Sequence, residues 1–177
     1  MKILIASDIH GNLENTIKLL EQFNKHQPDK LIILGDIYHG YSYSDSRQMA
    51  NLFSEYCDKL ILIRGNCDSI YDFDYSPVGL FNEYMIEFNN RNIYFNHGHT
   101  GYPNVTFNIG DIYCHGHTHI NKIDNYNGII ICNPGSISLP RGGSLASYMI
   151  IDDNGIHIYD FKNNIIKELL FEVLNEK

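Results

Sequence analysis

The feature that most constrains the fold is a set of three short, nearly continuous apolar runs, at residues 2–7, 30–34 and 59–63. Runs of this length that are rich in Ile and Leu are typical of strands buried on both faces of a sheet. The segments between them, residues 12–24 and 45–57, place apolar side chains at helical spacing. The first half of the chain therefore predicts alternating strands and helices around a parallel sheet.

The second half of the chain has the pattern of antiparallel hairpins. Turn-forming residues at 89–90, 125–128 and 153–155 each separate two apolar runs, and Asn, Asp and Gly are strong hairpin signals at such positions. The flanking runs are residues 81–88, 92–96, 120–124, 129–132, 147–152 and 156–161. No Pro-, Gly- or Ser-rich linker divides the chain, so we expect a single domain over residues 1–177.

Composition narrows the class of protein. A chain of 177 residues buries roughly 70% of its unfolded surface in one domain, which supplies a full core without disulfides. The four cysteines have no CxxC spacing, so we expect reduced thiols. No apolar run approaches the roughly 20 residues that span a bilayer, and the start of the chain has no signal-peptide pattern. We therefore expect a cytoplasmic protein without a membrane partner.

Charge argues against one class of partner. The formal net charge is −8 and the 13 Lys and Arg residues are scattered, whereas proteins that bind long nucleic acids gather basic residues along the phosphate backbone. Long nucleic acid is therefore not an expected partner. Bound divalent cations would add positive charge that this count omits, so a small anionic substrate is compatible with the composition.

Small clusters of metal-ligating residue types follow nearly every predicted strand. They are Asp8-Ile9-His10-Gly11, Gly35-Asp36, Gly65-Asn66-Cys67-Asp68, His97-Gly98-His99 and Gly116-His117-Thr118-His119. Because open α/β sheets bind ligands at the carboxyl ends of their strands, we expect these segments to meet in one site. Carboxylates and imidazoles together suit first-row divalent cations, and a carboxylate can bridge two of them, which is the role we expect for Asp36.

Each cluster taken alone has a structural explanation. Asp8 is of a type favoured at helix N-termini, and Asn66 and Asp68 are common turn formers. The segment 141–143, Arg-Gly-Gly, is compatible with a phosphate-binding loop or with a plain turn. A thiol enzyme built on Cys67 is disfavoured because that residue has no dedicated His-Asp support in the sequence. Five clusters in a fixed order favour a metal site over five unrelated turns.

The ordered set resembles the calcineurin-like metallophosphoesterase superfamily, whose pattern runs D-x-H, G-D, G-N-H-D/E, H and G-H-x-H. The resemblance spans about residues 2–140 and includes Asn133-Pro134-Gly135-Ser136, which is similar to a loop of the small bacterial and archaeal phosphodiesterases of the YfcE/MJ type. It implies an α/β fold, a four-layer α/β/β/α sandwich with two packed mixed β-sheets. It also implies two divalent metal ions, with manganese as the expected metal and iron, zinc or nickel as alternatives.

The resemblance assigns roles to individual residues. One metal is implied to bind Asp8, His10, Asp36 and His119, and the second to bind Asp36, Asn66, His97 and His117, with Asp36, Asn66 and His97 also expected to act in catalysis. The histidine that follows the Asn in many members is Cys67 here, which removes the usual proton donor and favours substrates whose leaving group needs no acid. His39, Cys67 and His99 are expected to contact the substrate. The short interval from His99 to Gly116 has no room for the helix of larger relatives, so we expect a more open pocket on that side.

These residues predict a metal-dependent phosphodiesterase that hydrolyses small or activated phosphodiesters by attack of a metal-bridging hydroxide on phosphorus. A phosphomonoesterase or protein phosphatase is one alternative, because the clusters do not identify a leaving group. A non-catalytic protein-binding scaffold is another, since the retromer subunit that resembles this chain serves in protein assembly, although every expected ligand position here keeps a ligating residue type. A nuclease is disfavoured by the lack of appended domains and of a basic surface. The expected partners are a small phosphate-ester substrate and, because members of the subgroup are often oligomers, further copies of the chain.

Overall fold

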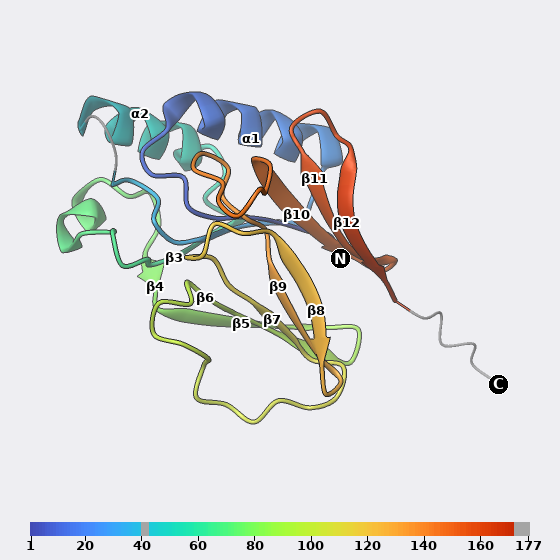
Figure 1. Ribbon diagram of the computed structural model, residues 1–177. Coiled ribbons are helices and arrows are strands. Elements are labelled where there is room, and N and C mark those ends of the chain that lie inside the picture. Colours follow the sequence, from blue (N-terminus) through green and yellow to red (C-terminus); the bar gives the residue numbers. More distant parts are fainter. Residues whose placement is uncertain (40–42, 172–177) are drawn as a thin grey trace.

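The computed structural model describes residues 1–39 and 43–171, and this part of the chain forms two packed β-sheets with helices (Figure 1). At its centre are three strands and two helices: β1 (Ile3–Ala6), α1 (Leu13–His26), β2 (Lys30–Leu34), α2 (Tyr43–Ser54) and β3 (Leu60–Ile63). β2 pairs in parallel with both β1 and β3. The predicted alternation of buried parallel strands and helices is therefore confirmed.

Antiparallel strands extend this group. β10 (Ser147–Asp152) pairs with β1, and β11 (Gly155–Asp160) and β12 (Ile165–Leu170) follow outward. The short strand β4 (Leu80–Phe81) is parallel to β3 at the other edge. In the described residues the first sheet thus has seven strands in the order β12-β11-β10-β1-β2-β3-β4. The hairpin predicted around residues 153–155 is confirmed as the β10–β11 pair.

The second sheet has five strands within the described chain, in the order β5-β6-β7-β9-β8. Their bounds in that order are Glu83–Phe88, Arg91–Asn96, Ile112–Cys114, Ile129–Asn133 and Lys122–Tyr126. The hairpins predicted around residues 89–90 and 125–128 are the β5–β6 and β8–β9 pairs. β7 is parallel to both β6 and β9, so both sheets are mixed, as the resemblance implied.

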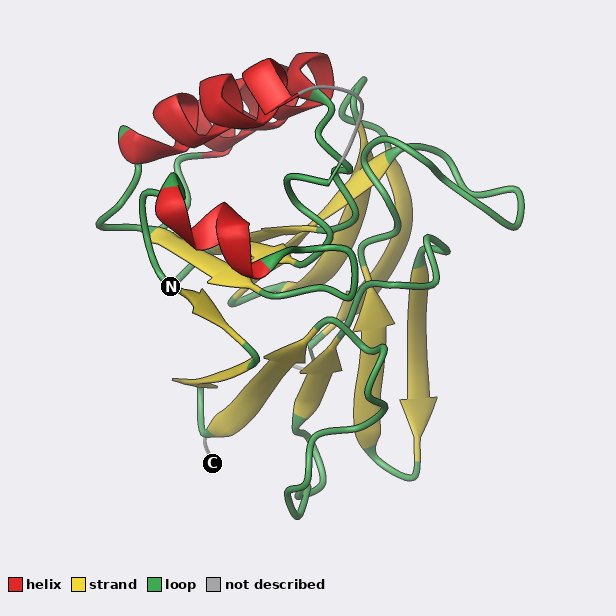
Figure 2. Ribbon diagram, turned by 90° about the vertical axis from the view of Figure 1, so that its left-hand side faces the viewer, coloured by secondary structure: helices red, strands yellow, loops and turns green. Residues whose placement is uncertain are grey.

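Alternation along the strands divides the interior into two apolar layers. Successive strand residues point to opposite faces, and β1 supplies both layers. Leu4 and Ala6 pack in the layer that also contains Phe23 of α1, whereas Ile3 and Ile5 pack in the layer between the two sheets. Both α-helices lie on the face of the first sheet that points away from the second (Figures 1 and 2).

The α/β class and the packing of two mixed sheets are confirmed, whereas the described residues place no α-helix on the outer face of the second sheet. Residues 97–111, between β6 and β7, contain no helix. The chain crosses from one strand to the next there by loops alone, as the short interval in the sequence predicted.

A 3-10 helix, residues Ile70–Asp74, follows β3. None of the described helices has the length and apolar character needed to cross a membrane.

A side-chain cap at the start of α1 gives a test of the fold. Asn12 Oδ1 accepts a hydrogen bond of 2.9 Å from the N–H of Asn15. We expect Asn12→Ala to lower the free energy of unfolding, measured by urea titration, by about 1 kcal/mol, because caps of this type contribute about that much. Asn12→Asp keeps the acceptor and should leave the free energy of unfolding nearly unchanged. An equal loss in both variants would show that the cap is not the cause.

Candidate metal centre

Five loops meet where β1, β2, β3, β6 and β7 end. They carry the predicted ligands Asp8 and His10, Asp36, Asn66, His97, and His117 with His119. Because β1, β2 and β3 are parallel, and β6 and β7 are parallel, the loops of each sheet lie at one edge. The predicted convergence of segments that are distant in sequence is borne out by the contacts between them.

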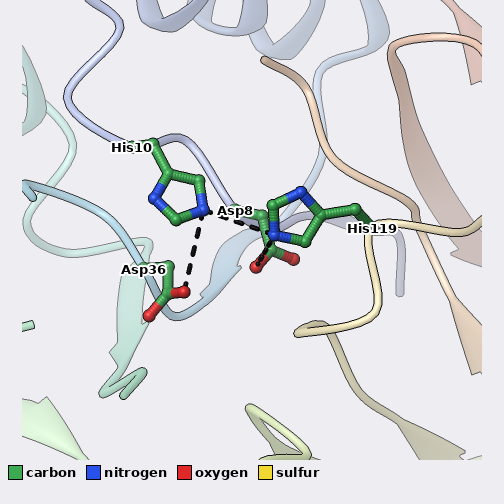
Figure 3. Close-up of side chains that lie close together, drawn as sticks. All are labelled: Asp8, His10, Asp36 and His119. Atoms are coloured by element: carbon green, nitrogen blue, oxygen red, sulfur yellow. Dashed lines mark hydrogen bonds and ion pairs between the residues drawn. The ribbon is translucent and has the colours of Figure 1, made fainter. Parts of the chain in front are cut away.

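Asp8, His10, Asp36 and His119 form a compact group (Figure 3). One ligating atom of each lies within 4.8 Å of those of the others. His10 Nε2 is 3.3 Å from His119 Nε2 and 3.7 Å from Asp36 Oδ2. His119 Nε2 is 3.2 Å from Asp8 Oδ1. Two imidazoles and two carboxylates that face one another in this way offer the donor set of a first-row divalent cation.

Asn66, His97 and His117 form a second group, which reaches Asp36 through His97. His97 Nε2 is 3.1 Å from Asn66 Oδ1 and 3.5 Å from Asp36 Oδ2. The centroids of the His97 and His117 rings are 5.2 Å apart. Since Asp36 Oδ2 faces both His10 and His97, the Asp36 carboxylate stands between two groups of ligating atoms.

Backbone carbonyls orient two of the imidazoles. His97 Nδ1 lies 2.6 Å from the carbonyl oxygen of Leu34, and His119 Nδ1 lies 2.7 Å from that of Leu139. A carbonyl oxygen can only accept, so Nδ1 of each neutral ring carries the hydrogen and Nε2 keeps its lone pair. This is the tautomer that an Nε2 metal ligand requires.

The backbone is strained at most of the predicted ligands. Five of them have left-handed φ values: Asp8 54°, His10 51°, Asp36 51°, His117 67° and His119 61°. Left-handed backbone is uncommon outside glycine, and such strain persists only where the surrounding structure holds it. Its concentration in these loops marks them as a site rather than as ordinary turns.

The carboxylates draw positive charge onto the imidazoles. Burial raises the pKa of Asp36, but the hydrogen bond and charge of His97, together with the Cys67 N–H 2.8 Å from Oδ1, outweigh burial and hold the pKa well below its ordinary value. Burial lowers the pKa of His97, but Asp36 raises it above the ordinary value. The contact with Asp8 raises the pKa of His119 in the same way. The centre is therefore electronegative and suited to cations.

One buried oxygen of the centre lacks a hydrogen-bond donor. Asp8 is fully buried, and its Oδ2 accepts hydrogen bonds from Ser7 Oγ at 2.7 Å and from the N–H of His117 at 3.0 Å. Within the described chain Oδ1 accepts none, and the neutral His119 ring, whose Nε2 lies 3.2 Å away, carries its hydrogen on Nδ1 instead. A buried carboxylate oxygen without a partner costs free energy. A cation would satisfy it, so the residues present fit a bound metal.

Two glycines allow the loops to approach one another. A Cβ on Gly65 would lie 2.2 Å from Asp36 Oδ1, and a Cβ on Gly116 would lie 1.9 Å from Ser7 Oγ. No side chain fits at either distance, so both positions require glycine. The close packing around Asp36 and Asp8 thus depends on residues that carry no chemistry of their own.

The two histidines predicted as substrate contacts lie at the rim. His99 is exposed, and its ring centroid is 5.4 Å from that of His97 and 6.3 Å from that of His117. His39 is also exposed. Burial lowers the pKa of His10, and the charge of His39 makes a smaller contribution in the same direction. The structure therefore places both histidines beside the centre and outside the two ligand groups.

Cys67 is close to the centre but stays a thiol at neutral pH. Asn66 Nδ2 lies 3.2 Å from its Sγ. Burial, followed by the charge of Asp36, raises the pKa of Cys67 to about 11. This protonation state argues against a thiolate nucleophile.

The sequence did not predict the roles of two serines that hold the ligand loops. Ser7 Oγ lies 2.7 Å from Asp8 Oδ2, as described above, and 3.1 Å from the carbonyl oxygen of Leu34. Ser136 Oγ donates to the carbonyl oxygen of Asp8 at 2.7 Å and accepts from the N–H of Leu139 at 2.7 Å. A serine next to a ligand at a strand end was the available signal for Ser7, whereas Ser136 is 128 positions from Asp8.

The sequence left Asp68 as either a turn former or a member of a cluster of metal-ligating residues, and the structure shows that it connects two ligand loops. Its carboxylate accepts hydrogen bonds from the N–H groups of Ile37 at 2.7 Å, Tyr38 at 3.3 Å and Gly65 at 2.8 Å. It therefore joins the loop of Asp36 to the loop that carries Asn66.

The alternative role considered for Asp8, a helix cap, is wrong, because Asn12 caps α1.

Comparison with known proteins places this chain in a family. The family described as "Calcineurin-like phosphoesterase superfamily domain" matches residues 1–155. Phosphodiesterase YfcE of Escherichia coli (strain K12) is 33% identical over 170 residues, which cover 89% of this chain and 91% of that protein. The probable metallophosphoesterase YsnB of Bacillus subtilis (strain 168) is 30% identical over 182 residues, 96% of each chain.

Two solved structures have a fold similar to that of this chain. The structure of YfcE, a phosphoesterase from E. coli, matches with a TM-score of 0.88 at 29% identity, over 97% of this chain and 100% of that chain. Vacuolar Protein Sorting 29 from Cryptosporidium parvum matches with a TM-score of 0.69 at 18% identity, over 96% and 98% of the two chains. At that identity the second likeness concerns the fold alone.

Removal of the Ser136 hydroxyl should weaken metal binding. This hydroxyl fixes the backbone of Asp8 and, through Leu139, the carbonyl that orients His119. We expect Ser136→Ala to raise the Kd for Mn²⁺ about tenfold in calorimetric titration of metal-stripped protein, because groups that orient metal ligands have effects of this size. Ser138→Ala is the matched control, since the Ser138 hydroxyl contacts Asn15 instead. An unchanged Kd in the folded Ser136 variant would contradict this role.

Metal binding should also weaken as the pH falls. The raised pKa values of His97 and His119 mean that each ring holds its proton to a pH above the ordinary value of about 6.5. That proton must leave before Nε2 can bind a cation, whereas Asp36, with its lowered pKa, is already ionised. We expect calorimetry in buffers of different ionisation enthalpy to show more protons released on Mn²⁺ binding at about pH 6.5 than at about pH 8. Equal proton release at the two pH values would contradict this assignment.

Proposed function

This chain belongs to the calcineurin-like phosphoesterase superfamily and is a metal-dependent phosphoesterase, and we propose that it is a phosphodiesterase with two metal ions that acts on small or activated phosphodiesters. The observation that carries the proposal is the position of Asp36, whose Oδ2 is 3.7 Å from His10 Nε2 and 3.5 Å from His97 Nε2. The likeness to phosphodiesterase YfcE supports the diester class.

The proposed ligand sets follow the two groups of side chains. Asp8, His10, Asp36 and His119 would hold one cation, and Asp36, Asn66, His97 and His117 the other. When bound there, two divalent cations supply Lewis acidity toward phosphoryl oxygens and a hydroxide nucleophile near neutral pH for in-line attack on phosphorus.

The chain's own residues prepare the centre for an anionic ester. The carbonyls of Leu34 and Leu139 keep Nε2 of His97 and His119 free to bind. The lowered pKa of Asp36 keeps that carboxylate ionised. Asn66 is a neutral ligand, so it adds no negative charge that would repel the substrate.

The protonation state of Cys67 limits the choice of leaving group. A thiol with a pKa of about 11 is a weak acid at neutral pH and cannot replace an imidazolium as proton donor. Esters whose alcohol leaves without a proton should therefore be cleaved fastest.

Several properties remain part of this proposal. We propose manganese as the working metal, with iron, zinc or nickel as alternatives, and a single domain over residues 1–177. We also propose a cytoplasmic location and a homo-oligomer. His39, Cys67 and His99 are proposed as substrate contacts from their places at the rim of the centre.

Hydrolysis of two aryl esters tests the proposal. Metal-stripped protein should cleave neither bis-p-nitrophenyl phosphate nor p-nitrophenyl phosphate, and added Mn²⁺ should restore cleavage with a preference for the diester. We expect Asn66→Ala to lower kcat/KM for the diester by roughly 100-fold or more, because it removes a ligand of the second group. Asn51→Ala, on the exposed face of α2, is the matched control and should behave as the parent protein.

The other outcomes point to the alternatives. Preferential cleavage of the monoester would identify a phosphomonoesterase or protein phosphatase. Stoichiometric Mn²⁺ binding without cleavage of either ester would favour a protein-binding scaffold.

A further inference from the structure

A pocket opens beside the second ligand group, on the side where no helix connects β6 to β7. It has a volume of about 660 Å³ and is lined by Arg64, Asn82, Glu83, His97, His99 and Thr100. This volume lies within the usual range for sites that bind small molecules. The pocket shares His97 with the metal centre, so a molecule held there lies next to an ester at the centre.

The pocket occupies the corner where the two sheets join. The chain leaves β4 in the first sheet and enters β5 in the second through Asn82. The N–H of Arg64 donates to the carbonyl oxygen of Phe81 at 2.7 Å, which fixes the end of β3 to this corner. Glu83 begins β5 and Thr100 lies in the loop after β6, so both sheets contribute to the lining of the pocket.

Beyond the two histidines, the side chains that line the pocket are all polar, and within residues 1–39 and 43–171 they have few partners. Arg64 Nε makes a long hydrogen bond of 3.4 Å to the carbonyl oxygen of Asp68. Neither Arg64 nor Glu83 belongs to an ion pair among the described residues, and Glu83 is exposed. The pocket thus offers the N–H donors of the Arg64 guanidinium and the Glu83 carboxylate as an acceptor. The Thr100 hydroxyl can act as a donor or as an acceptor.

These groups match the hydrogen-bonding pattern of an alcohol with several hydroxyls. A hydroxyl donates to a carboxylate and accepts from a guanidinium, and both partners are present here. An alkyl or acyl chain would cover the same polar groups and leave them unpaired, at a cost in affinity. A second anionic group would meet Glu83 as well as Arg64, so the charges of the pocket give it no net attraction.

We propose that this pocket binds one alcohol group of the phosphodiester and selects a hydroxyl-bearing alcohol, such as a polyol or a sugar, through Glu83 and Thr100. The proposal rests on the proposed function for the position of the phosphate at the metal centre. It adds a substrate class that the ligand residues alone do not specify.

Binding of two matched diesters to the Mn²⁺-loaded protein tests the proposal. Bis(2,3-dihydroxypropyl) phosphate and dipropyl phosphate share one carbon skeleton and differ only in hydroxyls, and each is symmetric, so the direction of binding does not matter. We expect the hydroxyl-bearing diester to bind about tenfold more tightly, as expected for hydrogen bonds to a charged group. In Glu83→Gln the difference should fall below about threefold, and Thr100→Val should reduce it as well.

Glu87→Gln is the control, because Glu87 lies on the same strand and is exposed but does not line the pocket. It should keep the full preference. Equal affinity for the two diesters in the parent protein would overturn the proposal, and so would a preference that persists in both Glu83→Gln and Thr100→Val. Failure of the proposed function would appear separately, as loss of bis-p-nitrophenyl phosphate hydrolysis, while the affinity ratio is measured without turnover.

Discussion

The metal centre depends on the parallel pairing of β1 with β2. Ala6 lies opposite Ile33 at the end of this pairing, and backbone hydrogen bonds continue beyond it, from the N–H of Asp8 to Gly35 at 3.1 Å and from the N–H of His10 to Asp36 at 2.8 Å. These bonds hold the two ligand loops in one register. A slip by one residue would turn the side chains of the slipped strand to the opposite face, so the apolar layers on both sides of the sheet also fix the geometry of the ligands.

Building the centre costs free energy that the rest of the domain must offset. Left-handed backbone costs on the order of 1–3 kcal/mol at each residue that adopts it, and five predicted ligands do so. Three carboxylates, those of Asp8, Asp36 and Asp68, are also buried. Backbone N–H groups of Cys67, His117 and Gly65, among others, donate to them, so the loops stabilise charge that the apolar interior would otherwise exclude.

The sequence predicted what depends on local pattern. Apolar runs identified the parallel strands β1, β2 and β3 and three hairpins. The spacing of Asp, Asn and His identified every side chain in the two ligand groups, whose role as ligands stays a prediction. Strands β4, β7 and β12 were not predicted: β4 has two residues and overlaps the single run predicted at residues 81–88, β7 has only three residues, and β12 is an exposed edge strand with charged residues. The role of Ser136 could not be predicted either, because its contact with Asp8 joins residues that are 128 positions apart. Such contacts follow from the packing of the whole domain, and no local pattern records them.

The electrostatics of the centre connect the fold to the proposed chemistry. Burial, opposed by three backbone hydrogen bonds, raises the pKa of Asp68, and the nearby charge of Asp36 raises it further. Burial lowers the pKa of His97, but Asp36 raises it above the ordinary value, and Asp8 raises that of His119, so both imidazoles favour a positive charge beside these carboxylates. Two divalent cations would compensate the same carboxylates with more charge and would also attract a phosphate ester into an otherwise acidic protein. A surface that served only to bind a protein would gain nothing from strained ligands, oriented imidazoles and a buried carboxylate oxygen without a donor, so these features favour an enzyme.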